Sequence, residues 1–137
     1  MPVEGEGSCA REVLLVEDSE NSAAMMEIAF STIPRVSLML ARSAMEAWRM
    51  LRGGTAVQAI VTDLNMPRMD GFELIRLVRQ DRQLAGTPII VVSADTDPET
   101  PARIAELGVD AFFRKPFSPA QLCRKLEQIL DGKSTPH

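Results

Sequence analysis

The stretch AIVTDLNMPRMDG, residues 59–71, decides the fold of this chain. It begins with a continuous apolar run that stops at Asp63, and residues 70–73 then open a segment of helical periodicity with a capping-box pattern. An apolar run without alternation is typical of a strand buried on both faces, as in a parallel sheet. The stretch therefore predicts a buried strand, a polar turn that carries Asp63, and a helix.

Similar runs lie on both sides of this stretch. Four more short apolar segments occur at residues 13–16, 36–40, 88–92 and 111–113. The intervals between runs have helical periodicity, as in the apolar face formed by Ala44, Ala47, Trp48 and Leu51. Strands that alternate with single helices predict a parallel sheet covered on both faces. We expect an α/β fold of the flavodoxin-like kind: a doubly wound, five-stranded parallel sheet in the order 2-1-3-4-5, in three layers, with a (βα)5 chain order.

The fourth helix is expected to be short, because two prolines restrict where it can start. Proline is tolerated in the first helical turn, so Thr100 as N-cap and Pro101 as the first helical residue predict a helix near residues 101–107. Residues 94–100 are then an irregular loop. A single domain is expected over residues 12–131, with a flexible N-terminal extension at 1–11, a flexible tail at 132–137, and no output domain after residue 131.

Composition excludes several classes of function. The chain has 137 residues, a formal net charge of −4 and a pI of about 5.0, which argues against binding to nucleic acid or to an anionic membrane surface. The N-terminus lacks the pattern of a signal peptide and no apolar run is long enough to span a membrane, so we expect a cytoplasmic protein. The lone histidine is His137, so a serine-histidine-aspartate triad and a histidine-rich zinc site are both excluded.

Polar residues with complementary chemistry follow four of the predicted strands. Strand one runs into Glu17 and Asp18, strand three into Asp63, strand four into Ser93, and strand five into Lys115. Ligands of doubly wound sheets bind beyond the carboxyl ends of the strands, where the strand order reverses. In the order 2-1-3-4-5 this point lies between strands one and three, so these side chains should converge there.

The charge of such a cluster points to a metal ion. Three carboxylates and one ammonium carry a formal charge of −2, which is unfavourable at close range unless a group protonates or a cation binds. Hard oxygen ligands favour Mg²⁺, with Ca²⁺ or Mn²⁺ as alternatives. A phosphoryl group is then an acceptable guest, and the carboxylate of Asp63 is the best placed nucleophile.

Each of these residues also has an ordinary structural interpretation. Asp18 can cap the first helix, alone or with Ser19, and Asp63 can open a turn. Ser93 can be a strand-end hydroxyl and Lys115 a surface lysine. These separate interpretations do not explain why the strand ends along one edge of the sheet carry groups that fit one chemistry.

Four motifs together resemble the response-regulator receiver domains of two-component signalling, including those of chemotaxis. They are VLLVEDS at 13–19, VTDLNMPRMDG at 61–71, VVSA at 91–94 and KPF at 115–117. The resemblance covers residues 12–130 and implies that Asp63 accepts a phosphoryl group. It also implies that Glu17, Asp18 and Asp63 hold Mg²⁺ together with the backbone carbonyl of Asn65.

The same resemblance assigns roles to residues beyond the acidic cluster. Ser93 and Lys115 would hold phosphoryl oxygens, and the bond between Lys115 and Pro116 would be cis. Phe112 occupies the position of an aromatic switch residue that turns inward when Ser93 moves toward the phosphoryl group. Glu17 stands where many relatives have aspartate, and Phe112 lacks the hydroxyl of a switch tyrosine.

These observations predict a signalling switch rather than a turnover enzyme. We expect a single-domain response regulator that receives its phosphoryl group from a histidine kinase or a histidine phosphotransfer protein. It would act on an unidentified protein through its fourth helix, fifth strand and fifth helix. A phosphorelay intermediate and a receiver-like module that works without phosphorylation remain alternatives, as do a cofactor binder of the same architecture and an aspartyl-phosphate hydrolase.

Overall fold

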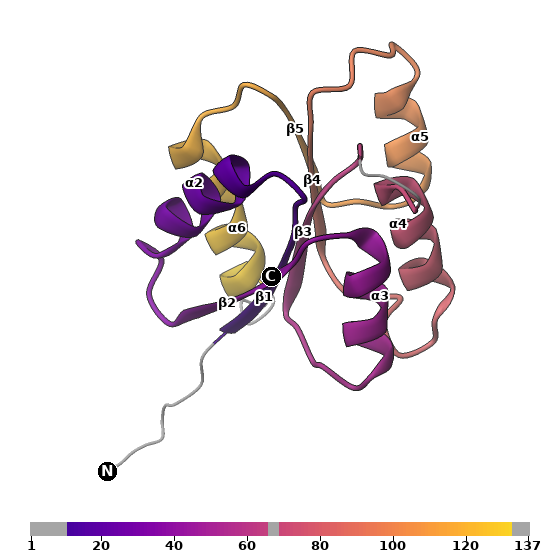
Figure 1. Ribbon diagram of the computed structural model, residues 1–137, viewed down its shortest axis with the longest axis horizontal. Coiled ribbons are helices and arrows are strands. Elements are labelled where there is room, and N and C mark those ends of the chain that lie inside the picture. Colours follow the sequence, from indigo (N-terminus) through magenta and orange to yellow (C-terminus); the bar gives the residue numbers. More distant parts are fainter. Residues whose placement is uncertain (1–10, 66–68, 133–137) are drawn as a thin grey trace.

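The computed structural model describes residues 11–65 and 69–132. Elements carry the labels of Figure 1, in which the helices begin at α2. The strands are β1 (Arg11–Val16), β2 (Val36–Ala41), β3 (Ala59–Asp63), β4 (Ile89–Ser93) and β5 (Ala111–Arg114), and the helices are α2 (Glu20–Phe30), α3 (Ala44–Arg52), α4 (Gly71–Gln80), α5 (Thr100–Glu106) and α6 (Pro119–Gly132). No helix within these described ranges is long and apolar enough to cross a membrane.

The predicted sheet is confirmed. The strands form one sheet in the order β2-β1-β3-β4-β5, and every neighbouring pair is parallel. The apolar run of β1 explains its interior position between β2 and β3, since a strand with apolar side chains on both faces must be covered on both faces. The fold is therefore the flavodoxin-like, doubly wound arrangement that the order of apolar runs predicts.

Helices cover the two faces of the sheet unequally. Helices α2 and α6 lie on one side, and α3, α4 and α5 lie on the other, which gives three layers (Figure 1). Successive residues of β1 divide between two core clusters: Leu14 and Val16 join the cluster with α3, α4 and α5, and Val13 and Leu15 join the cluster with α2 and α6. This alternation follows from the two-residue period of a strand.

Side-chain caps set the starts of three helices. The side chains of Ser19, Ser43 and Asp70 accept hydrogen bonds from backbone N–H groups three residues later, at the starts of α2, α3 and α4. Of the capping box predicted before α4, the bond to the Asp70 side chain is confirmed, whereas the Glu73 carboxylate accepts from Arg76 at 2.9 Å. Because Ser19 caps α2, Asp18 is not needed for that role and its carboxylate is available to the end of the sheet.

The fourth helix, α5, is as short as predicted but starts one residue earlier. Thr100 is its first residue and not its N-cap, which is Glu99 and makes no side-chain capping bond. The Thr100 hydroxyl instead donates to Asp95 at 3.2 Å, so it ties the helix start to the preceding loop. The prediction of Thr100 as N-cap was wrong because this carboxylate competes for its hydroxyl.

The predicted flexible ends lie almost entirely outside the described residues. Arg11 is the exception at the N-terminal end, where it begins β1, and Gly132 is the exception at the other, where it ends α6. Met66, Pro67 and Arg68, from the motif after Asp63, also lie outside the described residues.

Candidate functional site

Three carboxylates meet where β1 and β3 end. One carboxylate oxygen from each of Glu17, Asp18 and Asp63 lies within 4.8 Å of the other two. Glu17 and Asp63 are buried, and Asp18 is exposed at the mouth of the cluster. The position follows from the sheet: β1 and β3 are hydrogen-bonded neighbours, so the residues that follow them emerge side by side.

Lys115, which follows the edge strand β5, supplies the expected cation. Its Nζ lies 3.0 Å from Oδ2 of Asp63 and 3.3 Å from Oε1 of Glu17. The peptide bond between Lys115 and Pro116 is cis. Burial lowers the pKa of Lys115, but the hydrogen bonds and charges of Asp63 and Glu17 together outweigh burial and raise the pKa. Lys115 therefore stays protonated as a counter-ion and hydrogen-bond donor.

The burial and charge of this cluster raise the pKa of Glu17. Burial raises its pKa and the charge of Asp63 raises it further, while the backbone N–H of Ser19 and the ammonium of Lys115 act in the opposite direction. The net effect is a raised pKa, because burial and the charge of Asp63 together outweigh the contributions of Ser19 and Lys115. The cluster as a whole is an anionic site that gains from another cation.

The donor set fits a hard divalent metal ion. Glu17, Asp18 and Asp63 offer oxygen ligands from three separate positions, and their spacing lets one small ion contact all three. Asp18 at the exposed mouth leaves an entry path. The predicted fourth ligand, Asn65, is exposed. Its backbone N–H donates to Oδ1 of Asp63 at 3.1 Å, which keeps it next to the cluster.

Ser93 lies buried at the end of β4, beside β3 in the sheet. Its hydroxyl oxygen accepts a hydrogen bond from the backbone N–H of Asp95 at 3.0 Å, and Nδ2 of Asn65 lies 3.5 Å from it. The hydroxyl is thus linked to the loop that leads into α5 and to the residue that follows Asp63 by two positions.

Gly71 holds the strand end in place from the start of α4. A Cβ atom at this position would lie 2.4 Å from the carbonyl oxygen of Asp63 and 2.8 Å from Cα of Leu64. The N–H of Gly71 donates to the carbonyl of Leu64 at 2.9 Å. The close approach needs glycine, so this residue positions the backbone of the proposed nucleophile.

Phe112 lies apart from the charged cluster. It is half-buried on the edge strand β5, where it pairs in register with Val91 and packs against the core cluster on the side of α3, α4 and α5. The structure thus brings together the charged site residues and Ser93 and leaves Phe112 at the sheet edge.

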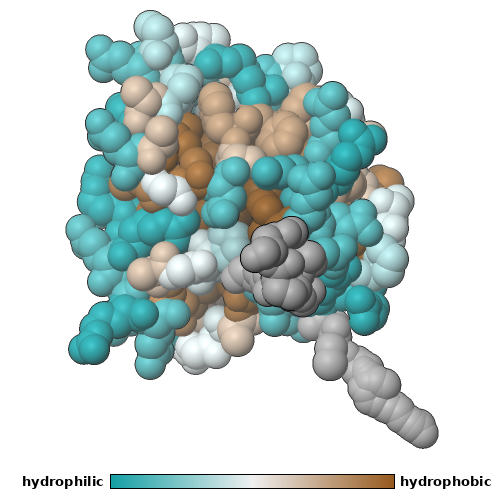
Figure 2. All heavy atoms as spheres, turned by 180° about the vertical axis from the view of Figure 1, so that it is seen from behind, coloured by the Kyte–Doolittle hydropathy of each residue, from teal (hydrophilic) through white to brown (hydrophobic). Residues whose placement is uncertain are grey.

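Seen from behind, the upper half of the molecule shows apolar side chains surrounded by hydrophilic ones (Figure 2).

Arg114 is a contact residue that the sequence did not reveal. Its Nη1 donates to the backbone carbonyl of Asp95 at 2.5 Å, and its guanidinium carbon lies 5.6 Å from the ring centroid of Phe112. An exposed arginine next to a strand end carries no distinctive signal when one of its partners is a backbone carbonyl. Only the register of β4 and β5, which pairs Ser93 with Arg114, shows the contact.

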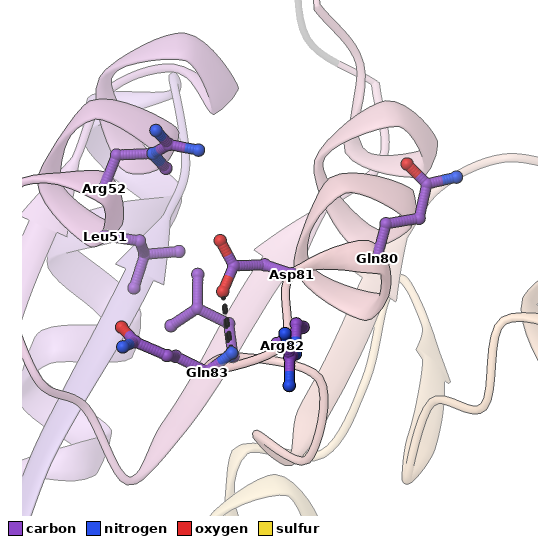
Figure 3. A pocket seen from close by; sticks show the side chains of 7 residues that line it. Leu51, Arg52, Gln80, Asp81, Arg82 and Gln83 are labelled. Atoms are coloured by element: carbon purple, nitrogen blue, oxygen red, sulfur yellow. Dashed lines mark hydrogen bonds between the residues drawn. The ribbon is translucent and has the colours of Figure 1, made fainter.

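Among the cavities lined by the described residues, two lie near different ends of the sheet. One, of about 480 Å³, lies between the last turns of α3 and α4, lined by Leu51, Arg52 and residues 80–84 (Figure 3). The Asp81 carboxylate in this cavity accepts hydrogen bonds from the N–H groups of Gln83 and Leu84. Both helices have their C-terminal ends there, and the helix dipoles disfavour an anionic ligand.

The second cavity adjoins the charged site. It has a volume of about 250 Å³ and is lined mostly by apolar groups from α2 and from the segment after β5, together with Lys115. Met25 contributes to it from α2 and is 51% exposed. Next to the charged cluster the surface is therefore apolar and open, which suits contact with another protein.

Known proteins share this sequence pattern and this arrangement. The family model of the response regulator receiver domain matches residues 13–127 of this chain. A chemotaxis protein CheY homolog of Campylobacter jejuni is 30% identical over 119 residues, which cover 87% of this chain and 92% of that protein. Chemotaxis protein CheY-3 of Vibrio cholerae is 28% identical over 120 residues, which cover 88% of this chain and 92% of that protein.

Solved structures agree with the sequence relatives. The signal receiver domain of a signal transduction histidine kinase from Syntrophus aciditrophicus has a TM-score of 0.84 and 30% identity, over 93% of this chain and 96% of that chain. The chemotaxis response regulator CheY4 of Vibrio cholerae has a TM-score of 0.77 and 28% identity, over 87% of this chain and 98% of that chain. The chain described here belongs to the response regulator receiver-domain family.

Proposed function

We propose that this receiver domain accepts a phosphoryl group on Asp63 and uses the modification to change its contacts with another protein. The observation that carries the proposal is the charged cluster at the ends of β1, β3 and β5. There Asp63 lies beside Lys115 and within 4.8 Å of two further carboxylates. An anionic cluster with one fixed cation is suited to bind a metal ion and a phosphoryl group together.

The transfer is a single displacement. A carboxylate oxygen of Asp63 forms a bond to phosphorus while the bond between phosphorus and the donor's imidazole nitrogen breaks, and that nitrogen keeps the electron pair. Lys115, already 3.0 Å from Asp63, is placed to neutralise charge on the transferred oxygens. The Ser93 oxygen accepts from the N–H of Asp95, and the hydroxyl can donate its own proton to one of these oxygens when the side chain turns toward them.

The metal in this proposal is Mg²⁺. Glu17, Asp18 and Asp63 would hold it through carboxylate oxygens, and the carbonyl of Asn65 is the fourth proposed ligand. Bound there, the ion neutralises negative charge on the carboxylates and on the incoming group. The exposed carboxylate of Asp18 lets the ion enter from solvent.

The phosphoryl donor is proposed to be a histidine kinase or a histidine phosphotransfer protein. The apolar cavity beside Lys115 supports a protein donor, because burial of Met25 and its neighbours favours association next to the acceptor. The carboxylates around Asp63 repel a free anionic donor, and a bound metal ion would reduce this repulsion. Small acyl phosphates can therefore serve as laboratory donors when Mg²⁺ is present.

The output is proposed to pass through α5, β5 and α6. When the Ser93 hydroxyl turns toward the phosphoryl group, the loop of residues 94–99 follows it, and Phe112 turns inward from the edge of the sheet. The new surface then binds an unidentified target protein. This is a shift between two packings of one fold, driven by the charge and acceptor oxygens of the added group.

A relay intermediate is the second candidate function. In that case Asp63 passes its phosphoryl group to a further histidine, and the surface of α5, β5 and α6 matters less than the face around the apolar cavity. The exposed position of that cavity, next to the proposed nucleophile, is the observation that favours it. Transfer from phosphorylated protein to a histidine phosphotransfer domain separates the two functions.

The decisive experiment is chemical modification with acetyl phosphate and Mg²⁺, followed by intact-mass measurement. We expect the mass of one phosphoryl group on the native chain and no addition on Asp63→Asn. Lys115→Met should slow the addition by about a hundredfold or more, the range seen when a catalytic charge is removed. Addition that persists in Asp63→Asn, or that proceeds equally well with excess chelator, contradicts the proposal.

A matched control is available in Asp70. This aspartate caps α4, a few residues after the nucleophile, and its Asn variant keeps the capping bond to Glu73. Asp70→Asn should accept the phosphoryl group like the native chain. A loss in both aspartate variants would show general disturbance of the strand end and not a specific role for Asp63.

A further inference from the structure

Arg114 contacts both segments of the switch proposed above. It ends β5, where the register pairs it with Ser93 across the last rung of the sheet. Its guanidinium donates to the carbonyl of Asp95 at 2.5 Å on one side and lies 5.6 Å from the centroid of Phe112 on the other. The first contact is a short hydrogen bond from a charged donor to a carbonyl oxygen, and the second lies within the range of a cation–π interaction.

Asp95 connects this arginine to the active end of the sheet. Its N–H donates to the Ser93 hydroxyl at 3.0 Å, and its carboxylate accepts from the N–H of Asp97 at 2.8 Å and from the hydroxyl of Thr100 at 3.2 Å. A movement of Ser93 therefore reaches the first residue of α5 and the guanidinium of Arg114 through one residue. The chain of contacts is continuous from Ser93 to Phe112.

We propose that Arg114 is a positioning residue that latches the loop of residues 94–99 to β5 and holds Phe112 in its half-buried place. The proposal rests on the proposed function, because it names the residue that couples movement of Ser93 to the aromatic ring. When Ser93 turns away from Asp95, the carbonyl of Asp95 shifts and the guanidinium loses its acceptor. Phe112 is then released from the arginine that lies over its ring.

The geometry supports a latch over a simple surface charge. Phe112 and Arg114 are two residues apart on one strand, so their side chains lie on the same face of the sheet. The acceptor on Asp95 is a backbone carbonyl and belongs to the segment that the switch must move. The Arg114 side chain thus contacts both the loop of residues 94–99 and the ring of Phe112. Its loss should favour the alternative packing, in which both have moved.

The test uses 4-fluorophenylalanine placed only at position 112 of the full chain and read by fluorine NMR, without and with beryllofluoride and Mg²⁺. Beryllofluoride gives the reference spectrum of the switched ring. In Arg114→Ala, without beryllofluoride, we expect the switched fraction to rise by about tenfold, the ratio set by the loss of one such charged hydrogen bond. With beryllofluoride, the native chain and the variant should give the same spectrum.

Two further variants separate a latch from packing alone. Arg114→Met keeps the apolar stem without a donor and should behave like Arg114→Ala, whereas Arg114→Lys keeps a charged donor and should restore most of the native spectrum. Arg52→Ala is the control, since Arg52 lies 5.8 Å from the ring of Trp48 on α3, away from the loop. It should leave the Phe112 signal unchanged.

The outcomes separate the latch from the proposed function. An unchanged resting spectrum in Arg114→Ala, on a chain whose Asp63 still takes up phosphoryl from acetyl phosphate, overturns the latch alone. A native spectrum in Arg114→Met also overturns it, because packing of the stem would then be sufficient. No response of the native Phe112 signal to beryllofluoride overturns the proposed switch itself, and the latch with it.

Discussion

The two ends of the sheet each contain a partly buried cation surrounded by oxygen atoms, and they differ in charge. At the carboxyl ends of the strands, Lys115 faces the carboxylates of Glu17 and Asp63. At the opposite end, Arg79 donates to carbonyl oxygens, at 3.0 Å to Leu107, 2.8 Å each to Ala85 and Thr87, and 2.9 Å to Gly108.

This difference separates a structural centre from a functional one. The acceptors of Arg79 are neutral carbonyls, with the carboxylate of Asp110 more distant at 3.9 Å, so its hydrogen bonds are satisfied within the fold. Burial lowers the pKa of Arg79, and Asp110 raises it in part. Around Lys115 the anions outnumber the cation, so the cluster keeps an excess of negative charge that a further cation would offset.

The largest expected effect is on the structural end. Arg79→Met should lower the free energy of unfolding by about 3 kcal/mol, because carbonyls of the turn after α5 and of the connection before β4 lose their donor. Urea unfolding followed by circular dichroism measures this loss. Phosphoryl uptake on the folded variant should be unchanged, since Asp63 lies at the other end of the sheet.

The control is Arg76, one turn earlier on α4. It pairs with Glu73 at 2.9 Å, and both side chains are about half exposed. Arg76→Met should cost about 0.5 kcal/mol or less, as usual for a surface ion pair. Equal losses in the two arginine variants would remove the distinction between a satisfied internal centre and an ordinary surface charge.

Gly71→Ala should have the next largest effect, and it acts at the functional end. The added Cβ would lie 2.4 Å from the carbonyl oxygen of Asp63, so backbone must shift, and we expect a loss of about 2 kcal/mol in stability. The same shift should slow phosphoryl uptake. Gly86→Ala is the matched control, because a Cβ there meets nothing within 4 Å and should change neither measurement.

Mg²⁺ should stabilise the functional end by a smaller amount. At ten times its dissociation constant, a ligand that binds the folded chain alone adds about 1.4 kcal/mol to the free energy of unfolding. Asp18→Asn should remove most of this gain, and Glu27→Gln, an exposed acid on α2, should retain it. A thermal shift with Mg²⁺ that is the same in all three proteins would contradict the proposed metal site.

The smallest effect concerns Cys123, a residue of α6 outside both centres. Burial raises the pKa of its thiol, and Glu127 adds to this while Thr32 acts in the opposite direction. Because the thiolate is the reactive form, alkylation of the folded protein should reach its half-maximal rate at a higher pH than in urea. Iodoacetamide kinetics on a Cys9→Ser background measure the shift, and an equal or lower midpoint in the folded protein contradicts it.

Local sequence patterns predicted most of the fold and the charged part of the site. The apolar runs placed the five strands, and Asp63, Ser93 and Lys115 followed from their positions at strand ends. The start of α5 was misjudged at Thr100, because its hydroxyl bonds to a carboxylate five residues earlier and does not cap the helix. Local capping rules do not include such a competing partner.

By itself, the order of residues determined the alternation of strands and helices, the parallel sheet, and the kinds of group that its carboxyl edge presents. These follow from periodicity and from side-chain chemistry, which are properties of short segments. Only the tertiary structure decided that Arg79 and Arg114 are tied to distant parts of the chain. Their partners include backbone carbonyls, which every residue has, so their choice depends on how the helices pack and not on any pattern in the sequence.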